Sequence, residues 1–388
     1  GFFSYNRPSA KKFLNQIRKP RVKYEPLIKV LISRDAILHN FRTYQGKYPA
    51  LKLAPVLKSN AYGHGLVEVA TILEPEKPPF LVVDSFYEAL VLRRAMVKSN
   101  ILVIGYSRDD LILRKTLKDI AFTIISLESL RNLAGKLTHP ARLHLKVDTG
   151  MHRQGLLPGE IPEAAKLIKS NPLMILEGVC SHFADADNPD QTFTKQQIAS
   201  WNEISSILKR QFGEIKYFHL AATAGLHYTS QIAANAARLG LGLYGINWGA
   251  PSQEIELKPA LEMRSVISSL KTVPRGEKIG YGITFETPAP LTLATVPAGY
   301  HEGIDLRLSN TGVFQVRGKS CAIAGRVSMN ITTIDVTGAA GARIGEDVIM
   351  ISNEPALPNS VENIAKICHT IPYEILVHIP PSLRRVII

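Results

Sequence analysis

Long apolar runs and closely spaced cysteines are missing from this sequence, and their absence excludes several classes of protein. No run of about 18 apolar residues occurs, so no membrane-spanning helix is expected. The three cysteines, Cys180, Cys321 and Cys368, are widely spaced and form no CxxC pair. Such cysteines favour a reducing compartment over a disulfide framework or a structural zinc site. We therefore predict a cytoplasmic protein with neither a metal site nor a membrane partner.

Signatures of nucleic-acid binding are also missing, although the formal net charge is +13. That charge favours anionic ligands, but no RNA-recognition or zinc-finger spacing accompanies it. Residues 1–27 hold seven basic residues ahead of the first acidic one, and no apolar stretch follows these charges as it does in a signal peptide. We interpret residues 1–27 as a basic, solvated extension and expect no nucleic-acid partner. An arm that binds a membrane surface or nucleic acid is the alternative.

The pattern of residues 28–252 predicts an α/β domain. Short apolar runs alternate with longer segments of helical spacing, and the runs lack the strict alternation that a half-exposed strand shows. The candidate strands are 51–57, 80–83, 101–104, 121–125, 143–147, 176–180, 217–221 and 239–244. The candidate helices between them include 87–96, 109–118, 127–136, 161–170 and 194–212. Eight such units predict a TIM-like (β/α)8 barrel. A doubly wound sheet is the alternative, but its GxGxxG turn is absent.

Residues 253–388 have a different pattern, which predicts a mainly β domain. Glycine and proline punctuate short apolar runs, which are 265–270, 291–296, 313–316, 331–336 and 347–351. Residues 360–368 have helical spacing instead. Residues 27–32 also have the character of a strand, which could pair with this second domain.

Several polar residues directly follow candidate strands of the barrel, where the catalytic groups of such barrels lie. Lys58 closes the first strand, and partial desolvation there would lower its pKa and favour Schiff-base chemistry. The commoner alternative is a lysine whose amine reaches solvent. Arg153 could bind a carboxylate through two hydrogen bonds or form a surface ion pair. His182 closes the sixth strand, where a lone histidine is usually structural.

The segments around these residues resemble the alanine racemase family, whose members are fold-type III enzymes dependent on pyridoxal 5′-phosphate (PLP). In chain order the matching segments are APVLKSNAYGHG (54–65), KVDTGMHRQG (146–155), SHFADAD (181–187), HLAATAG (219–225), ARLGLGLYG (237–245), KIGYGITF (278–285), GYHEG (299–303), GRVSMN (325–330) and YEIL (373–376). They lie in the order that the family shows. The resemblance spans nearly all of the chain after residue 28.

The resemblance implies a PLP site built from both domains. Lys58 would hold the cofactor as a Schiff base, and Arg238 would meet its pyridine nitrogen. His182 would lie beside the ring, and His219 would support Arg238. The phosphate would be bound by hydroxyl and backbone N–H groups, those of Tyr62, Thr223, Gly240, Leu241 and Tyr373.

The resemblance also implies an amino-acid racemase that works as a homodimer with shared active sites. Its simplest reaction is the interconversion of L-alanine and D-alanine, which supplies D-alanine for peptidoglycan. Lys58 and a Tyr281 contributed across the dimer interface would exchange the Cα proton from opposite faces. Around the substrate the resemblance implies Arg153 and Met329 for the carboxylate, Lys146 to position Arg153, and Tyr300 at the entrance. Lys146 is carbamylated in many relatives, so its carbamylation here is a hypothesis.

Other functions remain open at this point, and Arg238 bears on one of them. Arginine stays protonated, so a pyridine nitrogen facing it would remain unprotonated and the ring would be a weaker electron sink. This disfavours a fold-type III decarboxylase. A broad-specificity, serine or lysine racemase of the same fold is an alternative. A non-enzymatic PLP-binding protein is another, but such proteins generally lack the second domain.

The sequence departs from the family pattern at several positions. Thr223 replaces the usual serine and keeps a hydroxyl that can reach a phosphate oxygen. Ala222 replaces the usual asparagine and cannot make that side chain's cofactor contact. Leu239 stands in a proline position. Glu302 and Asn330 each stand where aspartate is usual, so we expect the electrostatics near Met329 to differ from those of relatives.

Overall fold

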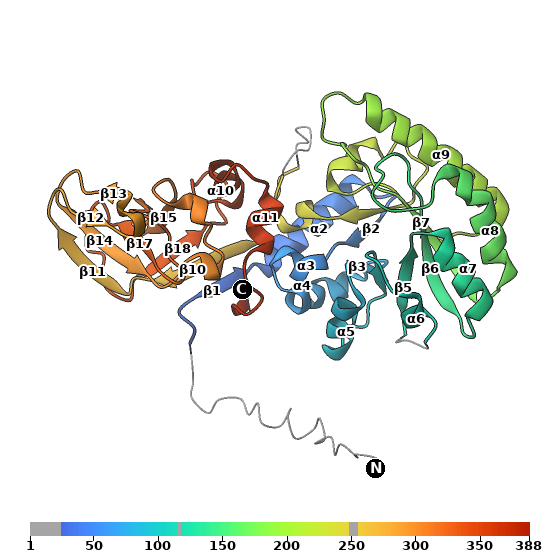
Figure 1. Ribbon diagram of the computed structural model, residues 1–388, viewed down its shortest axis with the longest axis horizontal. Coiled ribbons are helices and arrows are strands. Elements are labelled where there is room, and N and C mark those ends of the chain that lie inside the picture. Colours follow the sequence, from blue (N-terminus) through green and yellow to red (C-terminus); the bar gives the residue numbers. More distant parts are fainter. Residues whose placement is uncertain (1–24, 115–117, 248–254) are drawn as a thin grey trace, which may run out of the picture.

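The computed structural model describes residues 25–114, 118–247 and 255–388. The predicted basic extension therefore lies almost wholly outside the described residues, and the predicted domain boundary at 252/253 lies wholly outside them. Figure 1 shows a barrel on one side of the molecule and a β-rich domain on the other, with helix α11 (Pro372–Val377) between them. Among the described residues, no helix combines the length and the apolar content that a membrane crossing requires.

Eight parallel strands form the barrel, as predicted. Strands β3 to β8 make one parallel sheet in sequence order, and β2 pairs with β9. The two sheets are joined at both edges, because Leu57 donates to the carbonyl of Val82 at 2.7 Å and Arg238 donates from its backbone to Ala221 at 3.0 Å. The strands are β2 (Lys52–Pro55), β3 (Leu81–Val83), β4 (Ile101–Val103), β5 (Ile120–Ile124), β6 (Ala141–Lys146), β7 (Met174–Cys180), β8 (Tyr217–His219) and β9 (Ala236–Leu239).

Helices surround the barrel on its outer side (Figure 1). Serine N-caps start three of them, since the hydroxyls of Ser33, Ser85 and Ser126 accept from backbone N–H groups three residues later. The helices are α2 (Arg34–Lys47), α4 (Leu66–Leu73), α5 (Phe86–Arg94), α6 (Asp109–Ile112), α7 (Leu127–Lys136), α8 (Ile161–Ser170) and α9 (Thr192–Phe212). The short element α3 (Lys58–Tyr62) is not part of this outer layer, because it is a turn with non-helical residues at the end of the first strand.

Two predicted elements of the barrel are wrong in extent. The helix expected at 109–118 ends at Ile112. The strand expected at 239–244 is wrong, because β9 already ends at Leu239. Gly240 leaves the extended conformation, and residues Leu241–Tyr244 form the 3₁₀ helix η4. A Cβ on Gly242 would lie 2.5 Å from the Tyr44 hydroxyl, so glycine lets this turn pack against α2. Apolar composition alone does not separate a buried strand from a buried turn.

The second domain is built mainly from antiparallel strands, as predicted. A six-stranded sheet has the order β16-β15-β18-β10-β1-β19, a three-stranded sheet has the order β11-β14-β17, and β12 pairs with β13. The strands are β10 (Leu261–Val266), β11 (Ser269–Val273), β12 (Lys278–Ile279), β13 (Phe285–Glu286), β14 (Leu291–Val296), β15 (Val313–Val316), β16 (Lys319–Ala322), β17 (Thr332–Asp335), β18 (Asp347–Ile351) and β19 (Arg385–Ile387). The predicted run 265–270 is wrong as one strand, because Ile267 and Ser268 separate β10 from β11. Helix α10 spans Val361–Ile367.

Both ends of the described chain enter the six-stranded sheet. Strand β1 (Lys29–Ile32) pairs antiparallel with β10 and parallel with β19, which confirms the pairing expected for residues 27–32. Arg385 on β19 then reaches the barrel, where its Nη2 donates to the carbonyl of Gly63 at 2.8 Å and to that of Ile379 at 3.1 Å. Helix α11 also packs against α3. The second domain thus holds the loop that follows Lys58.

Replacing Arg385 by methionine removes the guanidinium and keeps most of the stem. We expect the free energy of unfolding to fall by about 1–3 kcal/mol, because partly buried carbonyls lose their donors. Urea unfolding followed by circular dichroism measures the change. Arg384→Met is the matched control, since the Arg384 side chain is exposed, and it should change stability by less than about 0.5 kcal/mol. Equal losses in the two variants would contradict this role of Arg385.

Candidate active site

Lys58 is followed by an unusual backbone turn. Ser59, Asn60, Ala61 and Tyr62 all have positive φ, between 49° and 56°. A left-handed conformation costs roughly 1–2 kcal/mol for each non-glycine residue, so the surrounding structure must stabilise it. Asn60 does so twice, since its N–H donates to Glu88 Oε1 at 3.2 Å and its Oδ1 accepts from the Leu66 N–H at 2.9 Å. The turn brings the Lys58 and Tyr62 side chains into the same cavity.

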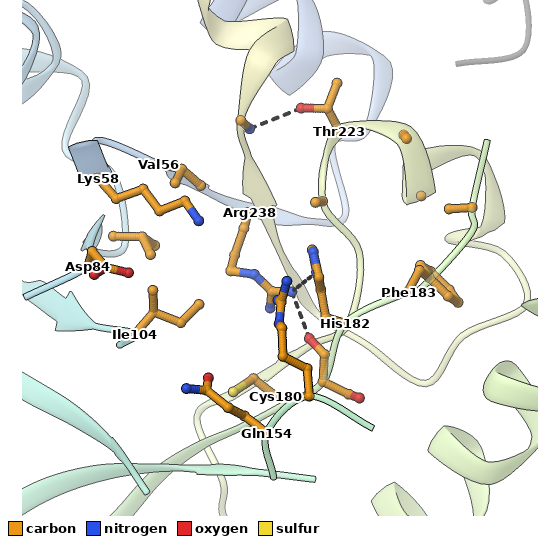
Figure 2. Close-up of a pocket in the computed structure, with 18 of the residues that line it drawn as sticks. Val56, Lys58, Asp84, Ile104, Gln154, Cys180, His182, Phe183, Thr223 and Arg238 are labelled. Atoms are coloured by element: carbon orange, nitrogen blue, oxygen red, sulfur yellow. Dashed lines mark hydrogen bonds between the residues drawn. The ribbon is translucent and has the colours of Figure 1, made fainter. Parts of the chain in front are cut away.

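That cavity has a volume of about 630 Å³ and lies at the carboxyl ends of the barrel strands. Figure 2 shows the Lys58 amine pointing into it, with Arg238 and His182 across the space. The structure brings together most of the residues that the sequence predicted for the site. Those that line the cavity are Lys58, Tyr62, Lys146, Arg153, His182, Thr223, Arg238, Gly240 and Tyr373.

Hydroxyl and backbone N–H groups form a cradle at one end of the cavity. Thr223 Oγ1 accepts from the Gly240 N–H at 3.0 Å (Figure 2) and from the Gly242 N–H at 3.4 Å. A Cβ added to Gly240 would lie 3.5 Å from the Tyr62 hydroxyl and 3.6 Å from Thr223 Oγ1, so the missing side chain leaves room for a ligand among these groups. Burial raises the pKa of Tyr62, which therefore stays a neutral donor. Neutral donors around an open space suit a phosphate.

The Tyr373 ring closes the cradle from the second domain, with its centroid 5.6 Å from that of Tyr62. Leu241 is the first residue of η4 and is buried beside the cradle, outside the cavity lining. A helix this short has too few aligned peptide groups to act as an anion site through its dipole. The cradle therefore depends on the hydroxyls and on the free space at Gly240.

Arg238 occupies the other end of the cavity and is almost completely buried. Its guanidinium donates to three backbone carbonyls, those of Ser181, His219 and Leu220, at 2.7–2.9 Å. It also donates to His219 Nδ1 at 2.6 Å and to His182 Nδ1 at 3.1 Å (Figure 2). Every one of these acceptors is neutral. Burial and the Arg238 charge together lower the pKa of His182 to about 2, so the His182 ring stays neutral.

The two lysines of the cavity experience a similar field. Burial lowers the pKa of Lys58, and the charges of Arg153 and Arg238 lower it further, although Asp84 opposes them. Burial also lowers the pKa of Lys146, whose residue is only 7% exposed. A lowered pKa raises the neutral fraction of each amine, and the neutral amine is the nucleophilic form. Both lysines are therefore better nucleophiles than exposed lysines.

Three predicted residues of the second domain do not reach this cavity from their own chain. Tyr281, Tyr300 and Met329 all lie on the second domain with exposed side chains, and Tyr281 is 73% exposed. Tyr300 and Met329 are near each other, because the Tyr300 N–H donates to Ser328 and the next N–H donates to the Met329 carbonyl at 2.9 Å. They form a surface separate from the cavity lining.

Two departures from the family pattern turn out to contact each other. Asn330 Nδ2 donates to Glu302 Oε1 at 2.7 Å, and Glu302 Oε2 accepts from the Gly299 N–H at 2.8 Å. The amide of Asn330 donates where a carboxylate would repel Glu302. This pair holds the segment that carries Tyr300.

Sequence reasoning missed several residues that line the cavity. Asp84 and Cys180 each lie at the end of a candidate strand, so strand position alone could have identified them. Tyr106 and Gln154 lie on loops and line the cavity as well. Gln154 directly follows Arg153 in the segment 146–155, which could have indicated it, whereas nothing in the sequence context of Tyr106 does.

Comparison with known proteins identifies the family. The model for the alanine racemase N-terminal domain matches residues 32–248, and the model for the alanine racemase C-terminal domain matches residues 260–387. The chain belongs to the alanine racemase family. It is accordingly an isomerase, and its predicted resemblance is confirmed.

Relatives in this family match along most of the chain. An alanine racemase from Syntrophobacter fumaroxidans is 36% identical over 89% of this chain and 93% of its own length. One from Methanococcus maripaludis is 34% identical over 87% of this chain and 92% of its own. The solved alanine racemase of Clostridium difficile 630 superimposes with a TM-score of 0.87 at 30% identity, covering 94% of this chain and 97% of that one. The alanine racemase from Bacillus anthracis with bound L-Ala-P gives 0.85 at 31% identity, covering 95% and 96%.

The Gly240→Ala variant tests the cradle. Its added methyl occupies the space between Tyr62 and Thr223, so we expect the affinity for PLP to fall by about 10–100-fold, the scale of one or two lost hydrogen bonds to a charged group. Fluorescence titration of the PLP-free protein with PLP measures the change. Gly159→Ala is the control, because no atom lies within 4 Å of its added Cβ. Unchanged affinity in Gly240→Ala would place the phosphate elsewhere.

Proposed function

We propose that this protein interconverts L-alanine and D-alanine with PLP as its cofactor. The observation that supports this most directly is the arrangement of one cavity, with a nucleophilic lysine between a neutral cradle and a buried arginine. When bound, PLP supplies an electron sink that stabilises negative charge at the Cα of an attached amino acid. The residues of the chain would bind and orient the reactants and move the proton.

The cavity fits PLP at three separate points. The cradle at Gly240 offers neutral donors to a phosphate, and Lys58 would hold the cofactor covalently through its amine. Arg238 would donate a hydrogen bond to the pyridine nitrogen without giving up its proton. His182, neutral and hydrogen-bonded to Arg238, would lie beside the ring.

Proton exchange at Cα would use Lys58 on one face and Tyr281 on the other. Tyr281 is too exposed to act within its own chain, so we propose that it enters the cavity of a second copy in a homodimer. The second domain supports this, because its Ile283, Met329 and Ile331 are also exposed large apolar residues. Such a surface is typical of an interface. Tyr300 would lie at the entrance to the shared site.

The substrate carboxylate would be bound by Arg153 and by Met329 across the interface. Arg153 lines the cavity but has an exposed side chain in the single chain, so something must position it. Lys146 would do so after carbamylation, because burial keeps its amine neutral enough to combine with carbon dioxide. The product D-alanine would supply peptidoglycan synthesis from the cytoplasm.

Co-expression of two inactive variants tests the shared site. Lys58→Ala and Tyr281→Phe should each lower kcat at least about 100-fold, the scale of a lost acid or base. In a symmetric dimer, random pairing makes half of the dimers mixed, and each mixed dimer has one site with both native residues. We therefore expect about one quarter of the native activity (one half of the dimers times one half of their sites).

The two variants purified separately and never mixed are the control for this assay. A chiral liquid-chromatography assay for D-alanine formed from L-alanine measures each sample. No recovery in the co-expressed sample would mean that Lys58 and Tyr281 act within one chain. Full activity of Tyr281→Phe would mean that Tyr281 is not the second base, and no D-alanine from the native protein would favour a non-enzymatic PLP-binding protein.

A further inference from the structure

A line of buried polar side chains runs down the barrel interior from Arg238 to the opposite end. It consists of Arg238 on β9, His219 on β8, His144 on β6 and Glu177 on β7. We propose that His144 and Glu177 are positioning residues, which orient Arg238 by fixing the tautomer of His219. The consequence for catalysis rests on the proposed function, because Arg238 matters to the reaction only if it meets the cofactor.

The two contacts nearest Arg238 are short, and every contact along this line involves a ring nitrogen. Arg238 Nη1 lies 2.6 Å from His219 Nδ1, and His219 Nε2 lies 2.8 Å from His144 Nδ1. His144 Nε2 lies 3.8 Å from Glu177 Oε2. All three side chains beyond Arg238 are buried. The line therefore joins a cation at the cavity to a carboxylate at the far end of the barrel.

The chemistry of the end groups determines where each proton lies. Arginine only donates, so His219 Nδ1 must be the acceptor and its Nε2 must bear the hydrogen. His144 Nδ1 must then accept, and its own Nε2–H faces Glu177, which only accepts. Burial lowers the pKa of both histidines, so each ring is neutral and has one N–H. Reversing either ring would set two N–H groups against each other in a dry interior, which is costly.

Glu177 is itself held firmly in place, so it determines which ring nitrogens along the line donate and which accept. Arg142 binds it through two hydrogen bonds, from Nε at 2.9 Å and from Nη2 at 2.7 Å. Lys216 lies 3.8 Å away. Although burial opposes it, hydrogen bonds from His144 and Arg142 hold the pKa of Glu177 at about 2, so the carboxylate is charged at any working pH.

The backbone of β7 is irregular where it supports this contact. The register between β6 and β7 shifts there, since Leu143 pairs with Leu176 but His144 pairs with Gly178, which leaves Glu177 as an extra residue. A Cβ on Gly178 would lie 2.4 Å from His144 Nδ1, so only glycine leaves room for the imidazole. Aromatic rings of Phe80 and Tyr217 flank His144, with centroids 5.4 Å and 5.9 Å away. The bulge, the glycine and the two aromatic rings together hold the His144 ring in one orientation.

Arg238 depends on this arrangement because its other acceptors cannot direct it alone. None of its hydrogen-bond partners among the described residues is a carboxylate. A His219 ring in the other tautomer would present an N–H to the guanidinium and push it away. Glu177 thus acts on the cavity indirectly. It sets the tautomers of the two neutral histidine rings, and these orient the guanidinium of Arg238.

Two measurements on the PLP-bound protein test this proposal. The first uses ¹⁵N-labelled histidine and two-bond ¹H–¹⁵N NMR, with the His219→Gln protein to assign the signals. We expect His219 and His144 both to have unprotonated Nδ1 and protonated Nε2 between about pH 6 and pH 9. Nδ1 protonation or a doubly protonated ring at His219 would overturn the proposal. This result does not depend on any change in folding or on whether alanine is the substrate.

The second measurement compares Glu177→Gln with Asp119→Asn. Asp119 also contacts Arg142, at 3.5 Å, but has no place in the line, and its positive φ of 61° is one that asparagine adopts readily. The amide that Glu177→Gln introduces must face either Arg142 or His144 with a donor, so we expect altered histidine signals and a fall in kcat of about tenfold, with KM changed less than about twofold. Asp119→Asn should match the native protein in both respects.

The outcomes separate this inference from the proposed function. Native histidine signals in Glu177→Gln would overturn the positioning role, with or without a fall in kcat, since the proposed effect passes through the tautomer. Equal changes in Asp119→Asn would overturn it too, because they would reflect the loosening of Arg142. A native protein that racemises no alanine would contradict the proposed function and leave the tautomer result standing.

Discussion

A guanidinium buried without a carboxylate partner is the constraint on which the site depends. Removing such a charge from water is costly unless every donor is satisfied. Nη1 and Nη2 of Arg238 meet that requirement with three carbonyls and two imidazoles, drawn from β8 and from the segments that follow β7 and β8. These acceptors converge only because parallel strands end at one edge of the barrel. The fold therefore positions the Arg238 side chain, and the histidines orient its guanidinium.

The protonation states in the rest of the cavity depend on burial and on that charge. Burial is the main cause that lowers the pKa of Lys58, Lys146 and His182, and the charge of Arg238 lowers all three further, so neutral bases are favoured throughout the cavity. The opposite end offers the neutral hydroxyls of Tyr62 and Thr223 beside the free space at Gly240, which suit a phosphate anion. A charged donor at one end and an anion cradle at the other make the cavity polar along its length. A cofactor with a phosphate and a ring nitrogen would enter it in one orientation.

The barrel could be predicted from sequence because its parallel strands are recognisable as apolar runs, and Lys58 and His182 lie just beyond two of these runs. Arg238 precedes the run expected at 239–244, so its prediction depended on the family resemblance. Features that depend on packing between distant segments could not be predicted from the sequence. The curl at 241–244 depends on Gly242 fitting against Tyr44, and the extra residue at Glu177 depends on pairing with another strand. The contact between Asn330 and Glu302 joins two departures that seemed independent in the sequence.

Racemisation by two bases can be tested directly through the hydrogen at Cα. The native protein is incubated with L-alanine in D₂O, and the early products are examined by proton NMR after chiral separation. If Lys58 and Tyr281 serve opposite faces, the proton removed by one cannot return through the other, so the D-alanine first formed should have deuterium at Cα. D-alanine that keeps its original proton would contradict two-base exchange and indicate a single base that serves both faces.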